Sequence, residues 1–170
     1  MIKVLVSSCL MGKKVRYDGS DNDVGDLQLK DWDEEGRLVH FCPEVAGGLG
    51  TPRSPAEITK GGGDRVLTRM TRVMNNEGVD VSEAFIHGAE QALQCAQKHQ
   101  IRIAILKESS PSCGSSFIYD GSFSGLKLRG QGVAATLLGQ NGIHVFNEND
   151  IPAALQYLTM LEKIALKRSN

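Results

Sequence analysis

The stretch Ile101-Arg-Ile-Ala-Ile-Leu-Lys-Glu-Ser-Ser-Pro-Ser-Cys-Gly114 joins an apolar run to a loop of small and turn-prone residues. The apolar part, residues 101–106, is typical of a buried parallel strand. In the part that follows, Glu108 to Ser116, serines and a proline surround the thiol of Cys113 and favour a tight loop with inward-pointing donors. Such donors stabilise a thiolate, so we expect Cys113 to lose its proton readily. The alternative is a strand-ending turn around a buried cysteine.

Strands and helices alternate along the rest of the chain, as apolar runs and helical periodicity indicate. The predicted strands cover residues 2–6, 37–41, 101–106 and 143–146, with a short extended arm at 117–119; the predicted helices cover about 24–29, 81–99, 132–138 and 150 onwards. This alternation predicts an α/β fold with a mostly parallel sheet between helices. We expect a single three-layer, Rossmann-like domain that spans residues 1–170.

Three smaller features are also predicted. Residues 56–59 and 66–71 resemble the arms of a small β-hairpin insertion that turns at Gly61-Gly-Gly-Asp64. Asp80-Val-Ser-Glu83 is typical of a capping box at the start of the long helix. The apolar spacing in the last helix indicates a buried face. That face is predicted to consist of Ile151, Leu155, Leu158, Leu161 and Ala165.

The composition limits the classes of function. A chain of 170 residues that is 41% hydrophobic, with a formal net charge of −1, lacks the positive footprint of a nucleic-acid-binding protein. No apolar run approaches the ~20 residues of a membrane helix, and the N-terminal run is too short for a signal peptide. We therefore expect a cytoplasmic protein that binds neither nucleic acid nor membrane. There its four cysteines stay reduced, which favours metal binding or catalysis over disulfides.

Three of the four cysteines directly follow a predicted strand. Cys9, Cys42 and Cys113 each lie in a loop rich in serine, glycine or proline, whereas Cys95 lies within the long helix. If the strands are parallel neighbours, the three loop thiols meet at one edge of the sheet, where α/β folds bind ligands. Three thiolates favour zinc, copper(I) or an iron–sulfur cluster, and they leave one coordination position open. A metal-free thiol enzyme and purely structural cysteines remain alternatives.

Polar neighbours of these cysteines indicate what chemistry the site performs. Glu44 follows Cys42 by two residues and is a candidate general base. Ser110 and Ser112 precede Cys113 and are candidate hydrogen-bond donors to a substrate or a cluster. The segment Arg16-Tyr-Asp18 follows Cys9 and is expected to line the mouth of the same pocket.

These motifs together resemble the DUF523 family, to which the thiouracil desulfidases belong. The resemblance rests on Ser8-Cys-Leu-Met-Gly12, Arg16-Tyr-Asp-Gly19, Cys42-Pro-Glu-Val-Ala-Gly-Gly-Leu49, Ser110-Pro-Ser-Cys-Gly114, Ile118-Tyr-Asp-Gly121 and Phe123-Ser-Gly125. It implies a [4Fe-4S] cluster, in preference to zinc, on Cys9, Cys42 and Cys113. It also implies assistance by a glutamate and a serine, for which Glu44 and either Ser112 or Ser110 are the matching residues.

The function that the resemblance implies is the non-redox desulfuration of a thiolated nucleobase or a related small molecule. Sulfur passes to the iron that no cysteine binds, and an oxygen atom from water replaces it at carbon. The main alternative is a non-catalytic or regulatory protein that binds an iron–sulfur cluster or zinc, and a zinc hydrolase comes third. The expected partner is a small-molecule substrate, for which a thiolated pyrimidine is the best match. The sequence leaves the oligomeric state open.

Overall fold

Four short parallel strands form the central sheet in the order β2-β1-β5-β8 of a computed structural model that describes residues 1–168. They are β1 (Val4–Ser7), β2 (Leu38–Phe41), β5 (Ile103–Leu106) and β8 (His144–Asn147). The chain first adds β2 on one side of β1 and then β5 on the other, so the strand order reverses between β1 and β5. Such a switch point is where open parallel sheets bind ligands. The predicted parallel sheet is confirmed.

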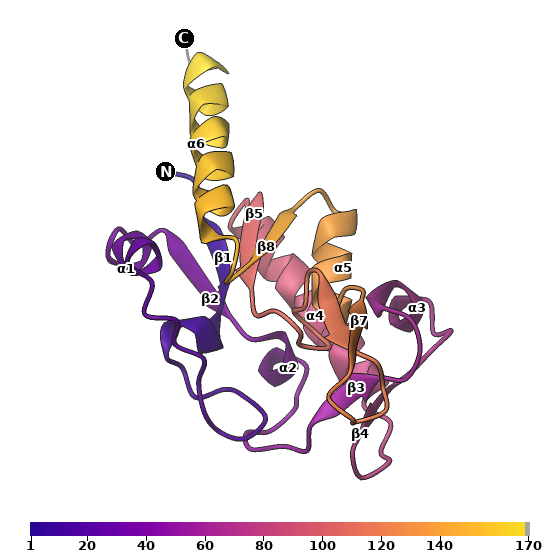
Figure 1. Cartoon of the computed structure of the whole chain (residues 1–170). Helices are drawn as coiled ribbons and strands as arrows, with labels where there is room; N and C mark the ends of the chain where they lie inside the picture. Colours follow the sequence, from indigo (N-terminus) through magenta and orange to yellow (C-terminus); the bar gives the residue numbers. More distant parts are fainter. Residues whose placement is uncertain (169–170) are drawn as a thin grey trace.

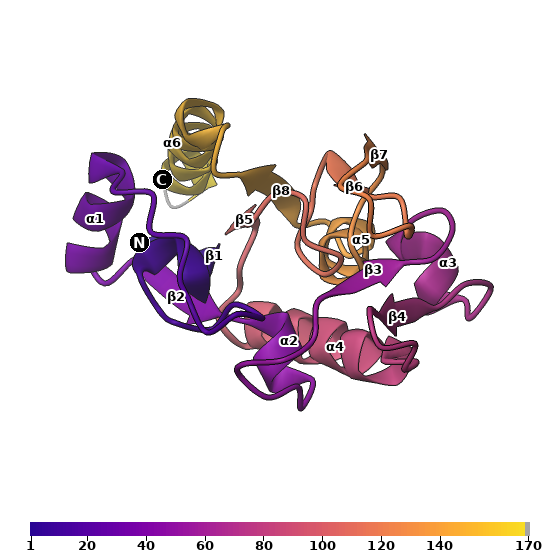
Figure 2. The ribbon, with the colours of Figure 1, turned by 60° about the horizontal axis from the view of Figure 1, so that its bottom comes forward.

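Helices cover both faces of this sheet, as Figures 1 and 2 show. One face carries α1 (Leu27–Glu34) and α6 (Ile151–Arg168), and the other carries α4 (Ser82–Lys98) and α5 (Val133–Gln140). Alternate residues of β1 serve the two faces, since Val4 and Val6 pack with α1 and α6 while Leu5 packs with α4 and α5. The predicted three-layer α/β architecture is therefore confirmed. None of the helices within residues 1–168 is long and apolar enough to cross a membrane.

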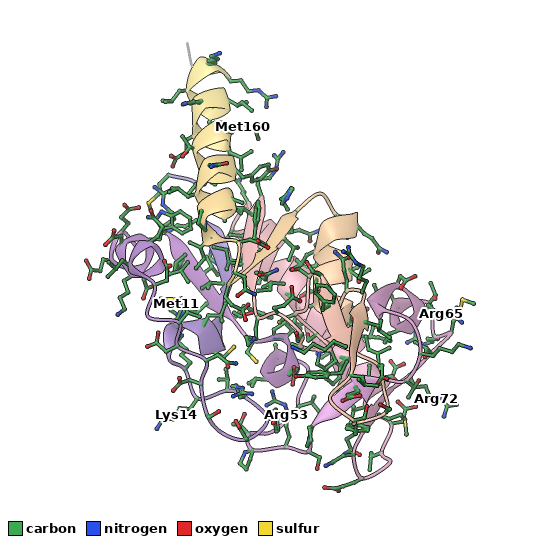
Figure 3. The ribbon with its side chains drawn as sticks, viewed as in Figure 1. Met11, Lys14, Arg53, Arg65, Arg72 and Met160 are labelled. Atoms are coloured by element: carbon green, nitrogen blue, oxygen red, sulfur yellow. The ribbon has the colours of Figure 1, made fainter. Side chains whose placement is uncertain are left out.

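The buried face of the last helix is shorter than predicted. The buried residues of α6 are Ile151, Ala154 and Leu158. Leu155 and Ala165 are exposed and Leu161 is only half-buried. The C-terminal part of α6, marked by Met160 in Figure 3, projects away from the sheet, and none of its described residues after Leu158 is buried. Helical periodicity identified an apolar stripe, but the sheet covers only its first half.

The hairpin insertion is present, although its second arm differs from the prediction. Strand β3 (Ala56–Ile58) pairs antiparallel with β4 (Val73–Asn75), and residues 63–67 form the short helix α3 (Gly63–Leu67). The glycine-rich segment is therefore not a hairpin turn, because Gly63 docks on the start of α5 and its N–H donates to the carbonyl of Gln131 at 2.7 Å. A second hairpin joins β6 (Phe117–Tyr119) and β7 (Lys127–Arg129).

The long helix α4 lies where it was predicted, but the capping box does not form. Asp80 instead accepts hydrogen bonds from the N–H of Ser82 at 2.9 Å and from its hydroxyl at 2.6 Å. Glu83 pairs with the exposed Arg69 at 3.0 Å. At the start of α1, Asp26 accepts from the N–H of Leu29 at 3.1 Å, so that helix begins later than expected.

Candidate active site

The three loop cysteines line one cavity of about 330 Å³ at the carboxyl ends of the strands. Cys9 lies in the short 3-10 helix η1 (Ser8–Met11) directly after β1, and Cys42 directly follows β2. The β1–β2 register aligns Ser7 with Phe41, so these two cysteines leave the sheet at nearly the same level. Cys113 arrives on the loop after β5. Cys95, in α4, does not line this cavity.

A close approach of two helices fixes the segment that carries Cys42 and Glu44. The short helix α2 (Pro43–Ala46) follows Cys42 and packs directly on α4. A Cβ on Gly88 would lie 2.1 Å from the carbonyl oxygen of Pro43, and one on Gly47 would lie 2.0 Å from that of Ala84. Only glycine at both positions allows this packing, which explains why a mid-helix glycine is present in α4 despite its low helix propensity.

A single carboxylate holds the loop that carries Cys113. The side chain of Glu108 accepts from the backbone N–H groups of Ser109, Ser115, Ser116 and Phe117, from the hydroxyl of Ser115 and from the amide of Asn147, at 2.8 to 3.3 Å. Burial raises the pKa of Glu108, but the backbone donors together lower it by more, so the pKa of this carboxyl lies below its ordinary value. Glu108 is therefore an anionic anchor for the whole loop.

The two candidate serines lie in different places. Ser110 lines the cavity, whereas Ser112 is fully buried outside it, and the hydroxyl of Ser112 has no hydrogen-bond partner within residues 1–168. The carbonyl of Ser112 accepts from the N–H groups of Ala134 and Ala135 at 2.9 and 3.1 Å, at the start of α5. Gly132 permits this contact, because a Cβ there would lie 2.5 Å from the Ser112 carbonyl. Ser110 is thus the serine that the structure brings to the site.

Glu44 is held by an arginine that sequence reasoning missed. The Nε and Nη2 of Arg53 both donate to Oε2 of Glu44, at 2.9 and 2.6 Å. Among residues 1–168, Oε1 of Glu44 accepts a hydrogen bond only from the hydroxyl of Ser110, at 3.3 Å. That hydroxyl oxygen itself accepts from the N–H groups of Ser112 and Cys113, both at 3.1 Å. The carboxylate therefore presents Oε1 toward the cavity in a fixed orientation.

Arg53 also ties a neighbouring loop to the site. Its Nη2 donates to the carbonyl of Val15 at 3.1 Å, and its N–H donates to that of Tyr17 at 2.7 Å. Figure 3 shows Arg53 beside α2. Arg16 and Tyr17 line the cavity as predicted, but Asp18 does not, because its carboxylate turns to Ser20 in an exposed turn. The only sequence signal for Arg53 was its place in a long glycine- and proline-rich loop.

Ser7 and Lys107, a further pair that the sequence did not reveal, lie at the cysteine end of the cavity. The hydroxyl of Ser7 contacts the thiol of Cys113, and its oxygen accepts from the N–H of Lys107 at 3.0 Å. The Lys107 ammonium pairs with Glu148 and donates to the carbonyl of Glu108 at 3.0 Å. The charge of Lys107 favours deprotonation of Cys9, and the charge of its partner Glu148 opposes it.

The expectation that Cys113 loses its proton readily is wrong. Burial raises the pKa of Cys113 well above its ordinary value, although the hydrogen bond from Ser7 opposes the shift, and the neighbouring Cys42 and Cys9 raise it further. Burial also raises the pKa values of Cys9 and Cys42. These upward shifts argue against a metal-free thiolate nucleophile. A bound cation would have to displace their protons.

The arrangement of the thiols bears on which metal centre they fit. Among residues 1–168, no group of three or more His, Cys, Asp or Glu side chains is arranged to hold a metal ion. The three thiols instead lie spread along the lining of the cavity of about 330 Å³. Thiolates bind zinc and iron–sulfur clusters alike, but a cluster distributes its ligands over several irons. The donor set therefore fits a cluster better than a single zinc ion.

Residues 4–150 match the family model of 2-thiouracil desulfurase. The chain belongs to this family. The 2-thiouracil desulfurase match covers most of the chain, and it confirms the resemblance that the three cysteine motifs indicated. A relative from Bacillus subtilis (strain 168), the uncharacterized protein YbbK, is 45% identical over 148 residues, which cover 87% of this chain and 97% of YbbK.

A solved structure shares the fold of this 2-thiouracil desulfurase family member. It is the [4Fe-4S]-dependent thiouracil desulfidase TudS, a DUF523 protein, with a TM-score of 0.86 and 43% sequence identity. The match covers 94% of this chain and 99% of that one. The α/β fold and the membership of the DUF523 group are therefore shown.

Proposed function

We propose that this protein hydrolyses the carbon–sulfur bond of a thiolated pyrimidine on a [4Fe-4S] cluster held by Cys9, Cys42 and Cys113. In the reaction the thiocarbonyl and one water give a carbonyl and hydrogen sulfide, so no electrons are gained or lost. One observation carries the proposal: cysteines from the ends of three adjacent strands line the cavity that also contains the oriented Glu44. The [4Fe-4S] dependence of the solved relative TudS supports it.

The three cysteines and their neighbours are suited to holding such a cluster. When bound, a [4Fe-4S] cluster on three cysteines supplies an iron with an open coordination position, a Lewis acid with affinity for sulfur. The positive charges of Lys107 and Arg53 favour the deprotonated forms of Cys9 and Cys42, respectively. Ser7 donates a hydrogen bond to Cys113 and orients its sulfur.

Glu44 is suited to the role of general base toward the attacking water. Both hydrogen bonds from Arg53 go to Oε2, so Oε1 retains its capacity to accept a proton. The hydroxyl of Ser110 points to the same oxygen, and two backbone N–H groups fix its position. Ser110 therefore orients Oε1 or the water bound to it, and we assign the assisting serine to Ser110 rather than Ser112.

The cavity suits a small heterocycle. Its volume of about 330 Å³, which a bound cluster would share with the substrate, lies near the lower end of the range for small-molecule sites, and both polar and apolar side chains line it. A free thiolated base such as thiouracil is therefore the proposed substrate. Thiols that must stay reduced agree with the cytoplasmic location that we expect.

The test begins with anaerobic purification, followed by iron and sulfide assays and an absorbance spectrum. We expect iron and acid-labile sulfide in equal amounts, loss of the 2-thiouracil absorbance, and release of uracil and hydrogen sulfide. Zinc without sulfide would contradict the proposal. A complete cluster without desulfuration of any thiolated pyrimidine would favour the regulatory alternative. Glu44→Gln should retain the cluster and lower kcat by about 10² or more.

A further inference from the structure

A buried carboxylate from the hairpin insertion forms part of the cavity wall. It belongs to a segment of the chain that contains none of the three loop cysteines. Glu57, on β3, is 8% exposed and lines the cavity together with Tyr119 and Lys127 of the second hairpin. The ammonium of Lys127 lies 5.2 Å from the centre of the Tyr119 ring and pairs with that ring. The proposed function gives none of these residues a part in holding the cluster or activating water.

The two oxygens of Glu57 have different surroundings. Oε2 accepts from the N–H groups of Gly121 and Phe123, at 2.9 and 3.1 Å. Oε1 has no hydrogen-bond partner among residues 1–168, and no cationic side chain there forms an ion pair with Glu57. Oε1 is not fully enclosed by protein atoms, and the cavity is the open space that Glu57 lines.

A largely buried carboxylate with one open oxygen requires a donor. Burying a charged group costs free energy unless hydrogen bonds compensate for the lost water. Two backbone N–H groups satisfy Oε2, while Oε1 is left for whatever fills the cavity. A thiolated pyrimidine offers such donors, since its thiocarbonyl carbon is bonded to ring nitrogens that carry hydrogen. Its exocyclic oxygen and sulfur carry none in the neutral thione form.

We infer that Oε1 of Glu57 accepts a hydrogen bond from a ring N–H of the substrate and thereby selects bases that are unsubstituted at that nitrogen. The inference rests on the proposed function, because it takes a thiolated pyrimidine as the ligand of this cavity. A carboxylate only accepts, so a methyl group at that nitrogen removes the hydrogen bond and also collides with the acceptor. Substrate discrimination by one buried acceptor is large, because the unpaired carboxylate remains costly.

A purely structural role for Glu57 is the competing explanation, because Oε2 holds the turn that contains Gly121. The neighbouring Asp120 provides a matched control. Its carboxylate holds the same turn through the N–H of Ser122 at 3.0 Å and the hydroxyl of Ser122 at 2.5 Å, but it does not line the cavity. Loosening of the turn alone should therefore follow from either substitution, whereas loss of substrate discrimination should follow only from changing Glu57.

The experiment compares 2-thiouracil with its N1-methyl and N3-methyl derivatives on the cluster-loaded protein. We expect Glu57→Gln to lower kcat/KM for 2-thiouracil about 10- to 100-fold, mainly through KM. On the unsubstituted enzyme, kcat/KM for one methylated substrate should be lower than that for 2-thiouracil by a similar factor. Glu57→Gln should lower kcat/KM for this methylated substrate little further. Asp120→Asn should lower kcat/KM for all three substrates by one small common factor. An equal loss for all three substrates on Glu57→Gln would overturn the inference.

A second readout separates this inference from the proposed function. Calorimetric binding of uracil and its two N-methyl derivatives to the loaded protein requires no turnover. We expect Glu57→Gln to weaken the binding of uracil at least about tenfold. It should also remove the preference of the protein for uracil over one of its methylated derivatives. That result without any desulfuration would sink only the proposed function, whereas absence of a methyl preference in the unsubstituted protein would overturn the inference. The latter comparison needs no variant, so it holds even if Glu57→Gln fails to fold.

Discussion

Arg53 donates two hydrogen bonds to a single oxygen of Glu44, at 2.9 and 2.6 Å, and leaves the other carboxylate oxygen to Ser110 and the cavity. An arginine that bound both oxygens would compete with any proton acceptor role of the carboxylate. The observed one-sided contact orients Glu44 without occupying its second oxygen.

Arg53→Met should lower kcat by about 10²-fold, because Glu44 loses its orientation relative to the bound water. Iron and sulfide content should stay close to that of the unsubstituted protein, since Arg53 contacts none of the three cysteines by a hydrogen bond within the described chain. Arg72→Met is the matched control, because Arg72 is exposed at the α3 end of the molecule (Figure 3). An equal loss of activity in both variants would contradict the role of Arg53.

Ser110→Ala and Ser112→Ala should have opposite consequences. Ser110→Ala should lower kcat at least about tenfold, because Oε1 of Glu44 loses its hydroxyl partner. Ser112→Ala should leave kcat unchanged and raise the free energy of unfolding by up to about 1 kcal/mol, because it removes a buried hydroxyl without a partner in the described chain. Steady-state kinetics and urea unfolding of the cluster-free protein measure the two effects. Loss of kcat in Ser112→Ala alone would reverse our assignment of the serine.

Cys113→Ala should abolish the cluster while Cys95→Ala should retain it. Removing a ligand is expected to lower iron content after reconstitution by at least about tenfold, since even changes to residues behind metal ligands cost 10- to 100-fold in affinity. Cys95 lies in α4 and does not line the cavity, so Cys95→Ala is the control for the loss of a thiol outside the site. Iron assay and the visible absorbance band measure both variants, and equal loss would show that the wrong three cysteines were chosen.

Glu108 should make the cluster-free protein sensitive to acid. The pKa of Glu108 is lowered from its ordinary value of 4.5, so its stabilising contribution is present above about that pH and is lost as the pH falls through the folded-state pKa. Urea unfolding between pH 7 and pH 3 should show this loss. Glu108→Gln should be less stable at pH 7 and should show a weaker decline with acid. If the free energy of unfolding of Glu108→Gln declined with acid as steeply as that of the unsubstituted protein, Glu108 would not be the anchor of the loop.

The strands and the cysteines could be predicted from the sequence, because local signals specify them. Short apolar runs that end abruptly in small residues indicate buried parallel strands, and Cys9, Cys42 and Cys113 each follow one. The chain order of strands and helices then implies that their carboxyl ends share an edge. The resemblance to the DUF523 family supplied the cofactor, which spacing alone left open between an iron–sulfur cluster and zinc.

The remaining features depend on contacts between distant segments. Arg53 lies on the long loop after α2 and Glu57 on β3, and both line the cavity, but no periodicity in the sequence predicts that they do. Ser110 and Ser112 differ by two positions, yet only the packing of the loop on α5 decides which one faces the cavity. The raised pKa of Cys113 is likewise a consequence of burial, which a loop of small polar residues conceals.

The order in which the sheet is assembled determines when the three thiols can meet. Cys9 and Cys42 follow β1 and β2, the first two strands of the chain, but Cys113 comes into place only when β5 pairs with the other side of β1. Because synthesis proceeds from the N-terminus, a nascent chain shorter than 113 of its 170 residues offers only two of the three thiols. A cluster on these three cysteines, as proposed, would therefore find its full set of ligands only after β5 has paired with β1.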